Sequence, residues 1–246
     1  MMMKALFVLA LVCPMLVAAS RGADAQALTS PNSNAGVAVR VGTLGVGFDL
    51  AVPVNEHVNV RGQGNFFGFS HDFDADGINL NAQLKLRSLN ALLDWFPLAG
   101  GFHVSPGVMI YNGNEVNATA LVPGGDMFSL GDEDLRSNPA NPVHGGATIS
   151  FKRVAPMLLL GWGNIVPRSE KRWSIPLELG VVFSRAPTAV LSLAGSACRR
   201  DGSFCRDVAT EPTLQADVAK EQATMNSDLE VLKIIPVFSF GFSYKF

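Results

Sequence analysis

The sequence is poor in charged residues and in long apolar runs. Asp, Glu, Lys and Arg make up 16% of its 246 residues, against roughly 25% in a typical soluble domain. Outside the N-terminus no apolar run reaches the roughly 18 residues that a membrane-spanning helix needs. Because 48% of the residues are hydrophobic, two classes remain. The chain is either a soluble protein with a large core or a β-barrel whose apolar residues alternate with polar ones.

The sequence also lacks an excess of positive charge. Its formal net charge is -2 at pH 7. A protein that binds nucleic acid through its phosphates needs a basic surface. The charge therefore indicates no nucleic acid partner.

The N-terminal segment has the three parts of a secretory signal peptide. Lys4 supplies a positive charge, residues 5–19 are apolar, and residues 23–25 read Ala-Asp-Ala, a small-x-small cleavage pattern. We therefore expect residues 1–25 to be a signal peptide and residues 26–246 to form the mature protein. Export would bring the mature protein into an oxidising compartment, where cysteines can form disulfides.

Cysteine is scarce, and only Cys198 and Cys205 lie outside the predicted signal peptide. They bracket the short polar segment CRRDGSFC, so a local disulfide is the expected pairing. In the chain-entropy model such a small loop contributes roughly 2–3 kcal/mol. A metal site is the alternative, although two thiolates do not complete a coordination shell.

The last thirteen residues, Ile234 to Phe246, read IIPVFSFGFSYKF. Aromatic residues occupy alternate positions from Phe238, and small or polar residues occupy the positions between them. This period of two predicts a strand with one aromatic face and one polar face. An exposed aromatic edge strand would aggregate in water. A strand between lipid and a polar lumen would not, so the stretch favours a membrane barrel.

Similar alternation recurs along the chain and predicts an all-β, antiparallel, up-and-down transmembrane β-barrel. The predicted strands cover residues 36–53, 57–70, 78–96, 101–111, 147–163, 173–185 and 233–246. The first changes phase at Gly42-Thr43, which indicates either a bulge or a tight turn. A turn gives about eight strands, the even number expected of bacterial single-chain barrels. Ten are possible if residues 112–146 or 186–195 also pair.

The connections differ in length, and the last long one contains a different pattern. Residues 212–232 carry apolar residues at near-helical spacing among good helix formers, which predicts one amphipathic helix. Trp95, Trp162 and Trp173 all lie beside short turns. Since aromatic girdles mark the membrane interfaces, the short turns and the C-terminus are expected at the periplasmic rim. The long loops 71–77, 112–146 and 186–232 are then expected outside the cell.

These features resemble small Gram-negative outer-membrane β-barrel proteins of the outer membrane protein A and W type. The resemblance covers the architecture of the mature chain and, as a motif, its last strand. It implies residence in the outer membrane, contact with outer-membrane lipid, and insertion by the barrel-assembly machinery. In that group the final strand ending in Phe is the assembly signal. The matching residues here are Phe240, Phe242, Tyr244 and Phe246.

Strand parity also predicts which charged residues face the lumen. An eight-stranded barrel has an interior barely wide enough for its own side chains. These charges are therefore expected to pair with one another, and a narrow pathway for solutes is the alternative. The predicted lumen charges are Asp49, Arg61, Lys85, Arg87, Asp94, Lys152, Glu178 and Lys245.

One loop has the first half of a calcium-binding pattern. Asp72, Asp74 and Asp76 precede Gly77 in a D-x-D-x-D-G order, so their carboxylates could converge on one cation. The twelfth position is Gln83 in place of the usual bidentate Glu. A solvated acidic hairpin loop is therefore the preferred interpretation, with calcium as the alternative. No other cofactor is expected.

Catalytic motifs are absent from the sequence. It has no G-x-S-x-G elbow, and its four histidines are scattered. His103 and Ser105 share a strand face, which ordinary alternation explains. The preferred function is therefore a non-enzymatic barrel with a structural or surface-interaction role. A narrow channel for small solutes and an outer-membrane lipid-modifying enzyme are the alternatives.

Overall fold

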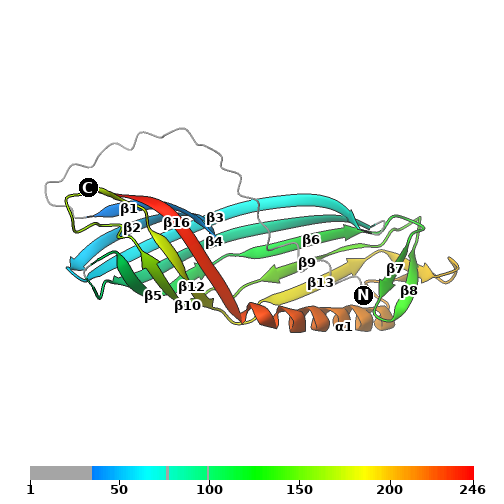
Figure 1. The fold of residues 1–246 in the computed structure, drawn as a ribbon. Helices are drawn as coiled ribbons and strands as arrows, with labels where there is room; N and C mark the ends of the chain where they lie inside the picture. Colours follow the sequence, from blue (N-terminus) through cyan, green and yellow to red (C-terminus); the bar gives the residue numbers. More distant parts are fainter. Residues whose placement is uncertain (1–34, 76–77, 99) are drawn as a thin grey trace. The chain divides into compact units, whose positions relative to one another are not determined.

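The computed structural model describes residues 35–75, 78–98 and 100–246. The predicted signal peptide lies outside the described residues. Eight strands form a closed antiparallel barrel (Figure 1). They are β1 (Gly36–Gly42), β2 (Gly45–Asn55), β3 (Val58–Ala75), β4 (Ile78–Trp95), β5 (Phe102–Asn112), β10 (Ala155–Trp162), β12 (Leu177–Phe183) and β16 (Ile234–Lys245).

The barrel closes between the first strand and the last. β1 pairs with β16 over its whole length, from Gly36↔Lys245 to Gly42↔Ser239. β16 also pairs with β12, so the C-terminal aromatic strand has a partner on both sides. The two-residue strand β11 (Trp173–Ser174) pairs with its last residues. Closure leaves no free edge in the barrel wall.

The phase change near the start of the chain is a tight turn. Gly42 pairs with Gly45 and the strands on either side form a regular antiparallel hairpin. Gly45 has a φ of 101°, a left-handed conformation that glycine adopts at little steric cost. The barrel therefore has eight strands, as predicted, because the segment 36–53 supplies two of them.

Beyond the barrel, the outer halves of β3 and β4 continue as a second part of the same sheet. β6 (Glu115–Leu121) pairs with β4, β9 (His144–Ser150) pairs with β6, and β13 (Thr188–Ala194) pairs with β9. Figure 1 shows this extension running away from the barrel end that holds the C-terminus. Residues 112–146 and 186–195 thus do pair, but outside the barrel wall.

Three predicted boundaries were wrong, two of them because of this extension. Residues 147–163 form two strands, β9 in the extension and β10 in the barrel. Residues 71–75 belong to β3 and are not a loop. The segment 173–185 is interrupted before Leu177, because Pro176 cannot donate a ladder hydrogen bond.

A small second sheet and one helix complete the extension. The sheet contains β7 (Met127–Leu130), β8 (Glu133–Ser137), β14 (Ser196–Arg199) and β15 (Arg206–Asp207). The predicted helix is present as α1 (Pro212–Asp228), followed by the 3-10 turn η3 (Leu229–Lys233). Apolar residues of α1, β7, β8 and β14 form a core outside the barrel, which includes Leu130, Leu135, Ala197, Leu214 and Val218. No helix in the described part of the chain has the length and apolar character needed to cross a bilayer.

The polarity of the two faces of β3 inverts where the strand leaves the barrel. Below Phe66 the lumen face carries Arg61, Gln63 and Asn65, all buried. Above it the same face carries Phe67, Phe69, His71 and Phe73. Phe66 pairs with Arg87, so β4 inverts at the same level. The two strands thus mark a boundary between a lipid-type exterior and a water-type exterior.

Near Ser88 the apolar residues move from even to odd positions without any break in the strand. β4 is continuous, and its even-numbered residues face inward throughout. Ser88, Asn90 and Asp94 are buried in the lumen, whereas Leu80, Leu84 and Leu86 continue that face in the extension. Side chains thus alternate regularly between the two faces along all of β4, whereas the apolar residues change from the inner face to the outer face where the environment changes.

Candidate functional site

A cluster of five charged side chains fills the middle of the lumen. Arg61 Nη2 lies 2.8 Å from Asp94 Oδ1 and 2.7 Å from Glu178 Oε1. Arg40 bonds Asp49 and Glu178. All five side chains are buried, and they come from β1, β2, β3, β4 and β12. We refer to Arg40, Asp49, Arg61, Asp94 and Glu178 as the ion-pair cluster.

Two neighbouring polar residues are tied to this cluster. His103 Nε2 lies 3.0 Å from Glu178 Oε1, and the Ser105 hydroxyl donates to Asp94 Oδ1 over 2.6 Å. Asp94, His103 and Glu178 carry ligand atoms within 4.8 Å of one another. The Arg61 guanidinium contacts both carboxylates, so it occupies the place of a cation between them. The arrangement fits a buried salt-bridge network better than a metal centre.

The barrel end with the short turns is closed by the segment that joins β10 to β11. We call residues 164–167 the mouth segment; all four are buried. Asn59 Nδ2 donates to Asn164 Oδ1 over 2.9 Å, and the Lys245 ammonium donates to the carbonyl of Pro167 over 2.6 Å. Ile165 and Val166 pack against Ala38 and Ala51 of the barrel wall. The segment is therefore a packed stopper rather than an open turn.

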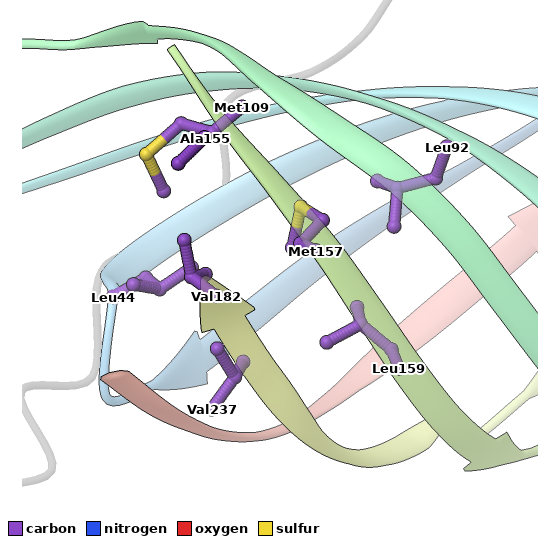
Figure 2. Close-up of a cluster of buried hydrophobic side chains, with 8 residues drawn as sticks. All are labelled: Leu44, Leu92, Met109, Ala155, Met157, Leu159, Val182 and Val237. Carbon is purple, nitrogen blue, oxygen red and sulfur yellow. The ribbon is translucent and has the colours of Figure 1, made fainter. Parts of the chain in front are cut away.

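The other half of the lumen is filled by apolar side chains. Figure 2 shows them converging from several strands into the barrel interior. This apolar layer consists of Leu44, Leu92, Met109, Ala155, Met157, Leu159, Val182 and Val237. Val182 pairs with Met157, and Glu178 pairs with Gly161 nearer the short turns. The layer therefore lies between the ion-pair cluster and the extension.

Very little space remains between these fillings. A cavity of about 10 Å³ lies where the ion-pair cluster meets the apolar layer, lined by Arg40, Glu178, Leu159 and Val237 among others. A cavity needs roughly 10–15 Å³ to hold one water molecule. At this level the described side chains leave room for about one water molecule.

The predicted lumen charges fall into two groups. Asp49, Arg61, Asp94 and Glu178 lie together in the ion-pair cluster, and Lys245 lies half-buried at the mouth. The other three lie outside the lumen: Lys85 is half-exposed, and Arg87 and Lys152 are exposed. The prediction for Lys85 and Arg87 was wrong because it assumed that the polar face of β4 always points inward.

Arg40 is the cluster member that the sequence prediction missed. It lies between Val39 and Val41, whose side chains are 48% and 46% exposed on the outer face. Alternation within that short strand could have predicted that Arg40 points inward. It could not have predicted that Arg40 pairs with Glu178, because Glu178 is distant in sequence and meets Arg40 only across the closed barrel.

Aromatic side chains gather at the rim with the short turns. Trp95, Trp162 and Trp173 are 48%, 63% and 52% exposed. Trp162 packs on Phe102 with ring centroids 4.9 Å apart, and Trp173 pairs with Tyr244. The outer face also carries the predicted assembly residues: Phe240, Phe242, Tyr244 and Phe246 are between 38% and 55% exposed. The rim therefore has the aromatic girdle of a membrane interface.

The extension has stabilising contacts of its own. Cys198 on β14 forms a disulfide with Cys205. α1 covers the outer edge of β13: Asn226 Oδ1 and Gln222 Oε1 accept hydrogen bonds from the amides of Ala189 (2.8 Å) and Leu191 (2.9 Å). Covering an edge in this way prevents pairing with another chain.

Two residues of the predicted calcium loop, Asp72 and Asp74, lie on the outer, polar face of the extension. Asp72 accepts a hydrogen bond of 2.6 Å from Asn81 Nδ2 on the neighbouring strand. Asp74 is on the same strand face, and Asp76 lies outside the described residues. An open hollow of about 700 Å³ is lined by both carboxylates with Asn79, Thr119 and His144. Strand geometry holds the Cα atoms of Asp72 and Asp74 roughly 7 Å apart.

The filled barrel with its aromatic rim is the fold of small outer-membrane β-barrel proteins. The crystal structure of Acinetobacter baumannii CarO matches it with a TM-score of 0.54 and 22% sequence identity, over 86% of this chain and 97% of that chain. The structure of A. baumannii CarO2 matches with a TM-score of 0.55 and 20% identity, over 86% and 98% of the two chains. No protein-family model and no curated protein matches this chain. At this level of identity the likeness concerns the fold.

Proposed function

We propose that the protein is a non-conducting outer-membrane barrel that displays the extension at the cell surface as its interacting part. The barrel serves as an anchor, and its lumen has a structural role. The outer face is apolar along β1, β2 and β16, while the extension presents a polar outer face. Such a division suits a protein that is held in lipid at one end and meets water and partners at the other.

The filled lumen is the observation that carries this proposal. A channel needs a continuous polar path, but here the mouth segment, the ion-pair cluster and the apolar layer follow one another along the axis. The apolar layer is the strongest obstacle, because a dry constriction excludes ions. The narrow-channel alternative would require all three fillings to rearrange.

Planar-bilayer recording of the refolded protein tests this proposal. We expect no discrete conductance steps, whereas a large porin reconstituted in the same way provides the positive control, since porins keep an aqueous channel. A matched variant places Gly at Leu92, Met157 and Leu159, and it tests whether the apolar layer is the barrier. Reproducible steps from the unaltered protein would refute the non-conducting role.

The route to the membrane is part of the same proposal. Residues 1–25 act as a cleaved signal peptide, and the barrel-assembly machinery recognises the last strand through Phe240, Phe242, Tyr244 and Phe246. The exposure of these aromatic side chains on the outer face supports a role in recognition beyond packing. Mass determination of the exported protein would locate the cleavage point, and removal of Phe246 should lower the amount of folded barrel in outer-membrane fractions.

A lipid-modifying activity is the weaker alternative. His103 and Ser105 are the nearest approach to a catalytic pair, yet each is buried and bonded to a carboxylate of the ion-pair cluster. A nucleophile has to reach its substrate, and the mouth segment and apolar layer cover both sides of these residues. Unchanged lipid composition, measured by mass spectrometry with and without the protein, is the expected result.

A further inference from the structure

Four basic residues have no assigned role and lie at one level of the barrel. Arg87 is on β4 where the polarity of the strand inverts, opposite Phe66. Lys152 and Arg153 lie three and two residues before the start of β10, and Arg185 lies two residues after the end of β12. We call Arg87, Lys152, Arg153 and Arg185 the basic arc. Each is exposed.

The pairing of the strands places these residues side by side around one part of the barrel. In the ring, β5 lies between β4 and β10, and β12 follows β10. β10 and β12 are in register near their outer ends, where Met157 pairs with Val182. The basic arc therefore runs from the middle of β4, past the outer end of β5, to the outer ends of β10 and β12.

The outward surface beside and below the basic arc is apolar. Phe66, Tyr111 and Phe183 are 52%, 43% and 46% exposed on β3, β5 and β12. An apolar and aromatic band that ends at a row of cations reproduces the profile of a lipid leaflet, from acyl chains to headgroups. The basic arc thus lies at the level expected for headgroup phosphates.

The basic arc is also electrostatically free to bind an anion. Within the described residues, its four side chains make no ion pair and no hydrogen bond. The nearby carboxylates of Glu115 and Glu230 are each paired with a lysine, Lys85 at 3.8 Å and Lys233 at 2.9 Å. The protein carries a negative formal charge of -2, so this local excess of positive charge runs against its overall composition.

We propose that the basic arc binds the phosphate groups of lipid headgroups in the outer leaflet and thereby sets the depth and tilt of the barrel. Arginine suits this role because its guanidinium binds phosphate oxygens in a bidentate way. The expected ligand is a lipid that carries phosphate groups beside its acyl chains, because its acyl chains would contact the apolar band below the arc. Free phosphate has no acyl chains and would contact the arc alone.

Binding of bisphosphorylated lipid A in mixed micelles tests the assignment. Each basic residue near an anionic lipid surface contributes roughly a factor of five in affinity. The variant Arg87→Gln/Arg153→Gln/Arg185→Gln should therefore bind lipid A on the order of a hundredfold more weakly. The matched control, Arg199→Gln/Arg200→Gln/Lys220→Gln, removes the same charge from the far end of the extension and should bind like the unaltered protein.

Two further measurements use the unaltered protein and do not depend on the variants folding. Lipid A without its phosphates should bind much more weakly, and added salt should weaken binding of the phosphorylated form. Inorganic phosphate at the same concentration should not compete. Equal binding of both lipids, equal binding by the arc variant, or full competition by inorganic phosphate would each overturn the proposal.

Discussion

Replacing Arg61 with Met tests whether the ion-pair cluster holds the barrel together. Arg61 contacts Asp94 at 2.8 Å, Glu178 at 2.7 Å and Asp49 at 3.8 Å, and its side chain is fully buried. The cluster sets two guanidinium groups against three carboxylates. Without Arg61, Arg40 alone faces all three. Removing one partner of a buried ion pair costs about 3–5 kcal/mol because the remaining charge is uncompensated.

A double-mutant cycle separates this effect from lost packing. Arg61→Met should lower the free energy of unfolding by about 3–5 kcal/mol, whereas Arg61→Met/Asp94→Leu should recover a large part of the loss because one carboxylate leaves with the guanidinium. Urea unfolding in lipid vesicles, followed by tryptophan fluorescence and by gel mobility before and after heating, gives these values. Arg199→Met, at an exposed site, should stay within about 0.5 kcal/mol of the unaltered protein. The reasoning would be refuted if the double variant recovered none of the lost free energy of unfolding, or if the Arg61→Met protein were as stable as the original.

Three further outcomes are expected. Cys198→Ala/Cys205→Ala should destabilise the extension by roughly 2–3 kcal/mol and leave the heat-dependent gel mobility of the barrel unchanged; loss of the barrel as well would contradict its independence. The hydrogen bond between Lys220 and Asp132 lowers the pKa of Asp132 below its usual 3.8 and raises the pKa of Lys220 above its usual 10.5. The small stabilisation by this exposed pair should therefore persist across neutral pH. It should fall in acid, as Asp132 is protonated, and in base, as Lys220 loses its proton. A Lys220→Gln variant compared across pH measures this. Millimolar calcium should leave the melting temperature unchanged, since Asp72 is held by Asn81 on a strand; a clear upward shift would restore the calcium alternative.

The sequence predicted the barrel well because the required information is local. Each strand follows from alternation with period two, and α1 follows from near-helical spacing over residues 212–232. The order of short turns and long connections then places the tryptophans at one rim. Gly42-Thr43 shows the limit of local evidence: a bulge and a turn have the same alternation, and only the pairing of β1 with β2 decides between them.

The ion-pair cluster was predicted in part. Parity identified Asp49, Arg61, Asp94 and Glu178 as inward residues, but it could not show that Arg40 joins them. Contacts across the lumen depend on how far each strand is shifted against its neighbours around the ring. That shift is a property of the closed barrel and has no counterpart in any single segment.

By itself, the sequence determined the repeating unit of this protein, an antiparallel strand with one apolar and one polar face, and the aromatic strand that closes the barrel. Tertiary structure alone decided what each face meets. On β4 the even-numbered residues all share the inner face, but that face meets two environments: Asp94 is buried in a lumen of charges, and Leu84 lies on the inner face of the extension. The reason is geometric: alternation records which residues share a face, while lipid, lumen, solvent or a second layer of the protein is assigned to that face only when the strands are assembled.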